Sequence, residues 1–222
     1  MRVKIAPSVL SADFARFGEE ARAAEEAGAD YLHLDVMDGR FVPNITFGPG
    51  VVEAIHRSCG LPLDVHLMIE EPERYVEVFA KAGAHILTVH AEATAHLYRL
   101  LMRIRELGCR AGVSLDPATP LEMVRHALDQ VDLLLLMTVE PGFGGQHYIP
   151  AMTRKIAEAR ALLDAEAPDV ELEVDGGVNL ETVPVVVGAG ARVLVAGSAA
   201  FGNPKGLKAA ISELRARAAL PA

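Results

Sequence analysis

The chain alternates eight times between a short apolar segment of strand type and a longer segment of helix type, with few residues between them. Apolar periodicity, together with glycine and proline at the segment ends, separates the two types. The predicted strands cover residues 4–9, 32–37, 63–68, 85–90, 110–115, 132–138, 171–175 and 192–196. The predicted helices cover residues 14–27, 49–58, 72–83, 95–107, 150–164 and 180–187, with two more that begin near Pro120 and Pro204.

Eight strands that are each followed by a helix predict an α/β fold of the (β/α)8 or TIM-barrel type, with right-handed crossovers throughout. A doubly wound open sheet is the alternative, and it needs a switch point that we cannot locate in the sequence. Because 51% of the 222 residues are apolar and no Pro/Gly/Ser-rich linker interrupts them, we expect a single catalytic domain over residues 1–222.

Charge, cysteine content and apolar run length exclude several classes of protein. The net charge of -9 argues against a nucleic-acid partner. Cys59 and Cys109 stand alone without metal-ligand spacing, which is typical of reduced thiols in a cytosolic protein. No signal-peptide pattern follows Met1, and the longest apolar run, at residues 133–137, is too short to cross a bilayer. We therefore expect a cytoplasmic protein that contacts neither nucleic acid nor membrane.

The strand at residues 32–37 carries polar side chains at alternate positions and ends in a loop that contains Gly39. Successive side chains on a strand point to opposite faces, so His33, Asp35 and Met37 share one face. Two groups that bind metals well therefore lie side by side on an otherwise apolar strand. The strand at residues 63–68 repeats this design with His66 and Met68 on one face, and Asp175 closes the strand at residues 171–175.

These polar residues predict a metal site. His33, Asp35, His66 and Asp175 lie at or near the carboxyl ends of their strands, where a barrel builds its active site. Two imidazoles and two carboxylates suit Zn²⁺ or another divalent transition metal. The other histidines that we considered are scattered along the chain, and none of them is predicted to be a ligand: His85, His90, His96, His126 and His147.

Two carboxylates in one site also suggest acid and base catalysis. Inverting a carbon next to a carbonyl requires removal of a proton from one face and delivery of a proton to the other. Asp35 and Asp175 lie on strands three steps apart around an eight-strand ring, so they can flank a substrate from nearly opposite sides. A metal bound to the substrate oxygens would stabilise the developing enediolate. The pattern therefore favours a two-base epimerase.

Further residues on the same faces have two interpretations each. Met37, Met68 and Met137 either form a polarizable, water-excluding floor under the enediolate or fill gaps in the barrel core. Asp64 and Glu173 share the inward face by parity, where they either orient the histidines or form ordinary buried pairs.

Three glycine-rich segments follow adjacent strands, namely residues 141–146, Gly176 with Gly177, and Gly197 with Ser198. Glycine lets backbone N–H groups approach an anion closely, and barrels often hold phosphate in the loops after their last two strands. Three such segments together favour a phosphate site over ordinary turns.

The chain closely resembles the ribulose-phosphate 3-epimerase family along almost its whole length. The resemblance is carried by residues 6–8 (APS), 33–39 (HLDVMDG), 41–44 (FVPN), 64–68 (DVHLM), 141–146 (PGFGGQ), 174–178 (VDGGV) and 196–199 (AGSA). It implies interconversion of D-ribulose 5-phosphate and D-xylulose 5-phosphate in the pentose phosphate pathway, and in autotrophs in the Calvin cycle. It also implies a homo-oligomer, either a dimer or a hexamer.

The resemblance further implies roles for individual residues. His33, Asp35, His66 and Asp175 would hold one divalent metal ion per subunit, Zn²⁺ in first place with Fe²⁺, Mn²⁺ and Co²⁺ as alternatives. Asp35 would accept the proton and Asp175 would donate one, with the roles exchanged in reverse. The implied substrate contacts are Ser8, His66, Gly142, Phe143, Gly144, Gly145, Asp175, Gly176, Gly177, Gly197 and Ser198.

Two other functions are kept open. A 3-epimerase for a ketohexose 6-phosphate such as allulose 6-phosphate would use the same four ligands, and loop residues would decide between the two substrates. A non-catalytic phosphosugar-binding protein would need neither carboxylate. Residues 41–44 are expected to close over the substrate.

Overall fold

All eight predicted strands form in the computed structural model, which describes residues 2–219. The strands are β1 (Lys4–Pro7), β2 (Leu32–Met37), β3 (Leu63–Met68), β4 (Ile86–His90), β5 (Arg110–Leu115), β6 (Leu133–Met137), β7 (Glu171–Asp175) and β8 (Val193–Ala196). The helices are α1 (Phe17–Glu26), α2 (Pro49–His56), α3 (Val76–Lys81), α4 (Leu97–Glu106), α5 (Glu122–Arg125), α6 (Met152–Glu166), α7 (Val183–Ala189), α8 (Ser198–Phe201) and α9 (Leu207–Ala218).

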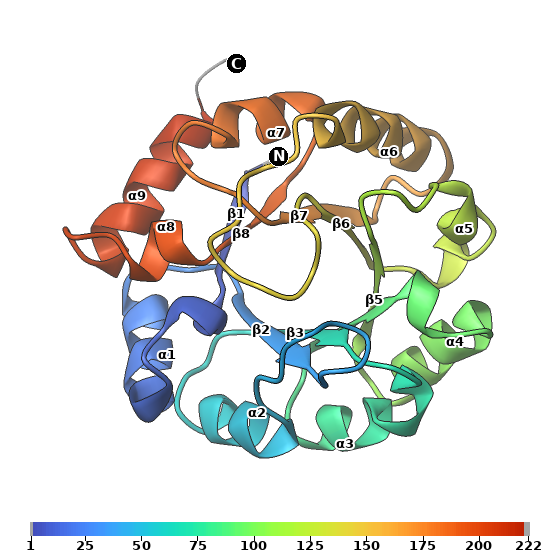
Figure 1. The fold of residues 1–222 in the computed structure, drawn as a ribbon, viewed down its shortest axis with the longest axis horizontal. Coiled ribbons are helices and arrows are strands. Elements are labelled where there is room, and N and C mark those ends of the chain that lie inside the picture. The colour runs from blue at the N-terminus through green and yellow to red at the C-terminus, as the bar shows by residue number, and fades with distance from the viewer. Residues whose placement is uncertain (1, 220–222) are drawn as a thin grey trace.

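The strands pair in parallel in the order β1-β8-β7-β6-β5-β4-β3-β2, and β1 and β2 then meet to close the ring. A parallel bridge joins Ser8 to His33, and the amide of Asp30 donates to the carbonyl of Ile5. Figure 1 looks into this ring and shows the helices surrounding it. The single-domain (β/α)8 barrel is therefore confirmed, and the doubly wound sheet is excluded.

Alternation along the strands divides the core into two layers. In β6, Leu134 and Leu136 pack outward in the large cluster that includes the helices, whereas Leu133, Leu135 and Met137 pack in a separate cluster inside the barrel. Parallel strands that are covered on both faces read as continuous apolar runs, which explains the sequence of β6. Period-two counting therefore identifies correctly which side chains face the barrel interior.

Several predicted helices are shorter than expected. The segment 14–27 begins with a 3₁₀ turn, η2 (Phe14–Arg16), because the Asp13 side chain caps the amide of Ala15 before α1 starts. The segment 72–83 likewise divides into η3 (Pro72–Arg74) and α3. The helix expected after Pro120 is a single turn, α5, and the short helix α8 was not anticipated. Three further 3₁₀ turns are η1 (Val9–Ser11), η4 (Ala91–Ala93) and η5 (Leu128–Gln130).

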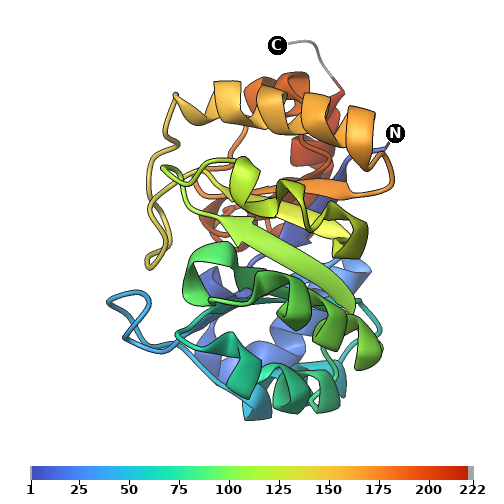
Figure 2. The same cartoon turned by 90° about the vertical axis from the view of Figure 1, so that its right-hand side faces the viewer.

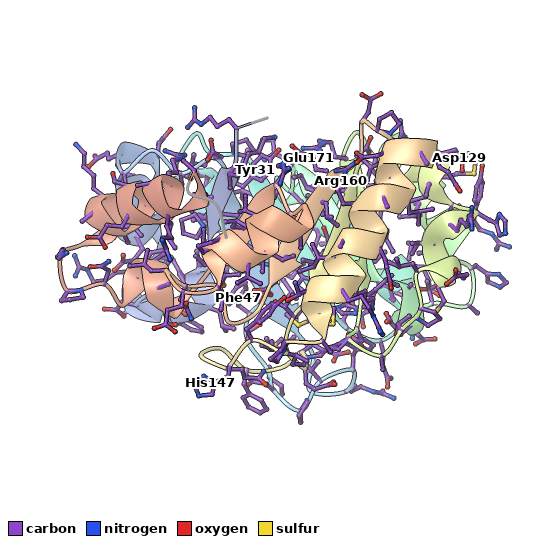
Figure 3. All side chains as sticks on the ribbon, turned by 90° about the horizontal axis from the view of Figure 1, so that it is seen from above. Tyr31, Phe47, Asp129, His147, Arg160 and Glu171 are labelled. Atoms are coloured by element: carbon purple, nitrogen blue, oxygen red, sulfur yellow. The ribbon has the colours of Figure 1, made fainter. Side chains whose placement is uncertain are left out.

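A charged network closes one end of the barrel. The hydroxyl of Tyr31 donates to Glu171 at 2.8 Å, and Arg110 donates to the same carboxylate at 2.9 Å. Lys4 also pairs with Glu171. Figure 3 shows Tyr31 and Glu171 at one end of the molecule and His147 at the opposite end. The network fills the amino-terminal end of the barrel interior, and in a barrel of this type the active site lies at the carboxyl ends of the strands.

Two long loops extend beyond that other end, one after β2 and one after β6, and Figure 2 shows both on the same side of the barrel. The carboxylate of Asp38 organises the first loop by accepting hydrogen bonds from the amides of Arg40, Phe41 and Glu70. The side chain of Asn44 donates to the carbonyl of Gly142 at 3.0 Å, which joins the two loops. Within residues 2–219, no helix is both long enough and apolar enough to span a membrane.

Candidate active site

Four predicted ligands converge at the carboxyl ends of β2, β3 and β7. One nitrogen or oxygen atom from each of His33, Asp35, His66 and Asp175 lies within 4.8 Å of the corresponding atoms of the other three. Oδ1 of Asp35 is 3.3 Å from Nε2 of His33 and 3.3 Å from Nδ1 of His66. The register of the sheet produces this arrangement, because Asp35 on β2 pairs with His66 on β3.

His33 directs an unused nitrogen into this cluster. Its Nδ1 is 2.7 Å from Oδ2 of Asp64, and that contact fixes the ring orientation. Its Nε2 is buried and, although it lies 3.3 Å from Oδ1 of Asp35, it has no hydrogen-bond partner among residues 2–219. A buried nitrogen without a partner is costly unless it binds a proton or a cation, so the site suits a metal ion. The contact with His33 favours the interpretation in which Asp64 orients a histidine, and Glu173 belongs to the same buried group.

His66 uses both ring nitrogens. Nδ1 faces Asp35, while Nε2 lies 2.8 Å from Nε2 of His90 on β4. Burial lowers the pKa of His66 to about 4, with Asp35 acting against it and the neighbouring His90 and His33 acting in the same direction. A neutral imidazole is the form that binds metals.

His90 is a residue that the sequence pattern did not assign to the site. It is completely buried, and its Nδ1 lies near Glu92 and Asp116 in a second group of potential ligands. Period-two counting along β4 places Ile86, Thr88 and His90 on one face, and this signal is present in the sequence. The spacing alone does not reveal that the ring of His90 contacts His66.

The two carboxylates have opposed electrostatic environments. The neighbouring His33 and His66 hold the pKa of Asp35 well below its usual range, although burial acts in the other direction. Burial, followed by the negative charge of Asp35, raises the pKa of Asp175 to about 7. Ser8 donates to Oδ2 of Asp35 at 2.5 Å, which leaves Oδ1 to face the histidines. One carboxylate is therefore ionised near neutrality while the other retains a proton for part of the time.

A cavity of about 230 Å³ opens directly above these carboxylates. Asp35 and Asp175 line it, whereas His33 and His66 are fully buried beneath it. The cavity brings together most of the remaining predicted residues, namely Ser8, Met37, Met68, Met137, Gly142, Phe143, Gly144, Gly145, Gly176, Gly177, Gly197 and Ser198. It is also lined by residues that the sequence did not single out as contacts, namely Leu10, Ser11, Val139, Pro141, Gln146, His147, Val178, Asn179 and Val195.

Glycine is required where the chain passes closest to this cavity. Gly177 has φ +66°, and a Cβ placed there would lie 2.3 Å from the amide nitrogen of Tyr148. Gly176 has φ +114°, and its Cβ would lie 2.4 Å from Val139. These two positions therefore exclude any side chain.

The barrel and the converging side chains define a TIM-barrel enzyme with a candidate metal site of histidine and aspartate. Sequence comparison then gives the family, because the model of the ribulose-phosphate 3-epimerase family matches residues 4–201. The chain belongs to this family, whose members are isomerases.

Relatives match nearly end to end. The chain is 56% identical to the ribulose-phosphate 3-epimerase of Bacillus subtilis over 214 residues, which is 96% of this chain and 98% of the relative. It is 48% identical to the enzyme of that name from Escherichia coli K12 over 217 residues, which is 97% of this chain and 96% of the relative.

Solved structures resemble the fold at much lower sequence identity. KGPDC from Streptococcus mutans has a TM-score of 0.74 at 13% identity, with 97% of each chain covered. A 3-hexulose-6-phosphate synthase has a TM-score of 0.69 at 21% identity, with 99% of this chain and all of the other covered. At these identities the likeness shows the barrel fold alone.

Proposed function

We propose that this enzyme interconverts D-ribulose 5-phosphate and D-xylulose 5-phosphate by transferring protons at C3. The observation that carries this proposal is the pair Asp35 and Asp175, which line one cavity and have opposed pKa shifts. Membership of the ribulose-phosphate 3-epimerase family supports the substrate.

Asp35 is the base in the direction that starts from D-ribulose 5-phosphate. Its carboxylate is ionised, and Ser8 holds Oδ2 at the edge of the cavity. Asp175 is the acid in that direction, because it lines the same cavity from β7 while Asp35 lines it from β2. After inversion Asp35 holds the proton and Asp175 is ionised, so the reverse reaction exchanges the two roles.

His33, Asp35, His66 and Asp175 would hold one divalent metal ion, and their mixed nitrogen and oxygen donors suit Zn²⁺ first. Fe²⁺, Mn²⁺ and Co²⁺ are accepted by the same donors. When bound, the cation supplies positive charge that offsets the negative charge developing on the substrate oxygens. Asp64 supports this set by orienting His33.

The rest of the cavity would bind the phosphate and exclude water. Backbone amides at Gly176, Gly177 and Gly197, with the hydroxyl of Ser198, suit a phosphate group. The loop 141–146 lines the same cavity. On the barrel side, Met37, Met68 and Met137 present an apolar surface that keeps water from the carbon that loses its proton. We also propose that the enzyme is cytoplasmic and forms a homo-oligomer, as the sequence predicts.

A coupled assay tests this function. Turnover of D-ribulose 5-phosphate and of D-allulose 6-phosphate is measured on purified protein, on the chelated apoprotein, and after each of the four metals is restored. We expect fast turnover of the pentose phosphate that is lost with the metal and regained on re-addition. Preference for the hexose phosphate would mean that the substrate is a ketohexose 6-phosphate, with the same proton transfer at C3. If neither substrate turns over with metal loaded, the chain is a phosphosugar-binding protein.

A further inference from the structure

A second buried group of polar side chains lies behind the candidate metal site, and the proposed proton transfers do not use it. Nδ1 of His90 lies 3.2 Å from Oδ1 of Asp116 and 3.4 Å from Oε2 of Glu92. His90 is completely buried, and its other nitrogen contacts His66 at 2.8 Å. The group therefore joins a candidate metal ligand to two carboxylates.

The contact between the two rings limits where their protons lie. Nε2 of one ring faces Nε2 of the other, so one of them donates and the other accepts. For Nδ1 of His66 to offer a lone pair to a cation, the proton of His66 must be on Nε2. Nε2 of His90 then accepts that proton's hydrogen bond, and the proton of His90 is on Nδ1, where it faces Asp116 and Glu92.

We propose that His90 is a positioning residue that fixes the tautomer and ring orientation of His66, and that Glu92 and Asp116 in turn fix the tautomer of His90. This inference rests on the proposed metal site. The series of side-chain contacts runs from the two carboxylates through His90 and His66 to the metal site. It has the same design as the pair Asp64 and His33, with one imidazole added between carboxylate and ligand.

Hydrogen bonds fix the carboxylate of Glu92 and the backbone of Asp116, whereas Oε2 of Glu92 and Oδ1 of Asp116, which face His90, accept none from the described residues. The backbone amide of Asp116 donates to Glu92 at 2.8 Å, and Lys155 donates to the carbonyls of Asp116 and Pro117 at 2.6 and 3.2 Å. The ring of Phe41 packs against His90 with 4.7 Å between ring centroids. His90 is therefore constrained on several sides, as a residue that orients another must be.

A cation bound by His90, Glu92 and Asp116 is the competing explanation for this group. It would need the lone pair of His90 on Nδ1, which puts the proton of His90 on Nε2. Nε2 of His66 would then have to accept the hydrogen bond from His90. Nδ1 of His66 would carry the proton of that ring and could no longer bind the metal. The two cation sites therefore exclude each other, and the ammonium of Lys155 beside the carboxylates disfavours the second.

The proton positions are measured first on the wild-type protein, by ¹⁵N NMR of histidine-labelled, Zn²⁺-loaded and substrate-free enzyme. We expect the proton of His66 on Nε2 and the proton of His90 on Nδ1. The opposite tautomers would overturn the proposal. This measurement needs no variant, so it holds even where a substitution at this buried position disturbs folding.

Metal affinity is then measured by competition with a chromophoric chelator. His90→Phe keeps the ring volume without an acceptor, and we expect about 10- to 100-fold weaker Zn²⁺ binding. His90→Gln restores an acceptor, and we expect affinity within a few-fold of wild type. The exposed His126→Gln serves as the control, with no change expected.

The outcomes separate this inference from the proposed function. If the wild type binds no metal, the proposed metal site fails and the inference fails with it. If the wild type binds one equivalent and His90→Phe binds it equally tightly, the positioning role alone is wrong. A second equivalent of metal that is lost in Glu92→Gln and Asp116→Asn would identify a separate cation site and also overturn the proposal.

Discussion

Asp35 and Asp175 face one cavity from strands β2 and β7, and their pKa values are shifted in opposite directions. The difference follows from their neighbours, because Asp35 lies between two imidazoles whereas Asp175 is partly buried and lies near the negative charge of Asp35. A pair that differs in this way can give and take protons at a single carbon.

Ser8 is expected to tune the base. Its hydroxyl donates to Oδ2 of Asp35, so Ser8→Ala removes a hydrogen bond to an ionised group. We expect kcat to fall about 10-fold or more, with metal content unchanged by elemental analysis. Ser58→Ala removes a hydroxyl that donates to the carbonyl of Ala54 on α2, outside the barrel, and it is expected to leave kcat unchanged. Equal kcat in the two variants would contradict the role of Ser8.

Gly177 is expected to be essential for both stability and phosphate binding. Gly177→Ala combines a positive φ with a clash against the backbone of Tyr148, so we expect a loss in free energy of unfolding of about 2 kcal/mol or more and a raised KM. Gly206 has φ +86°, and a Cβ added there would meet no atom of residues 2–219 within 4 Å, so Gly206→Ala isolates the effect of φ, at about 1 kcal/mol. Denaturant titration compares the two, and equal losses would refute the steric argument.

The network at the opposite end of the barrel gives a pH prediction. Burial opposes ionisation of Glu171, but hydrogen bonds from Lys4, Arg110 and Tyr31 lower its pKa below the usual value of 4.5. A carboxylate whose folded pKa is depressed contributes stability above its unfolded pKa, and this contribution is lost as pH falls through the folded pKa. We therefore expect Glu171→Gln to be less stable than wild type at pH 7 by about 1.5–3 kcal/mol, with the difference shrinking below pH ~4.

Denaturant titrations across this pH range check the Glu171 prediction. The control is Glu158→Gln on α6, where an exposed pair with Arg154 is expected to contribute nothing measurable. A stability difference for Glu171→Gln that stays constant down to about pH 3 would show that the effect is not ionisation. Epimerase activity is expected to survive this substitution, because Glu171 lies at the far end of the barrel.

The loop at residues 41–44 is expected to close over bound substrate, and Asn44 already donates to the carbonyl of Gly142 in the other long loop. Trypsin can cut after Arg40, whose side chain is 73% exposed. A substrate analogue should slow that cut in wild type and less so in Asn44→Ala, while cleavage after the exposed Arg154 stays constant as a reference. Cleavage after Arg40 that is unaffected by the analogue would argue against closure.

Much of this arrangement could be predicted from sequence because it follows from periodicity. Parity along β2 and β3 puts His33, Asp35 and His66 inside the barrel, and glycine-rich segments indicate the side where phosphate is expected. Helix lengths were less predictable, since the change from a 3₁₀ turn to an α-helix at Phe17 and the left-handed backbone at Glu71 depend on local geometry. The alternation of side chains along a strand cannot show which side chains of different strands touch inside the barrel.

His90 illustrates that limit. Its inward position can be read from β4, but its contact with His66 depends on the register of β3 against β4 and on the size of both rings. The pKa shifts of the two aspartates likewise depend on distances between residues that are far apart in the sequence. Such distances come only from the folded chain.

The most direct test of the two-base mechanism follows hydrogen at C3 in heavy water, with Asp175→Asn reloaded with metal. NMR measures exchange and inversion of D-ribulose 5-phosphate separately. We expect Asp175→Asn to lose epimerisation by at least about 100-fold while Asp35 continues to exchange the C3 hydrogen without inversion. Asp35→Asn, assayed from D-xylulose 5-phosphate, is the mirror control. Epimerisation at the wild-type rate in Asp175→Asn, or no exchange by either metal-loaded variant, would contradict the assignment of these aspartates as the acid and base.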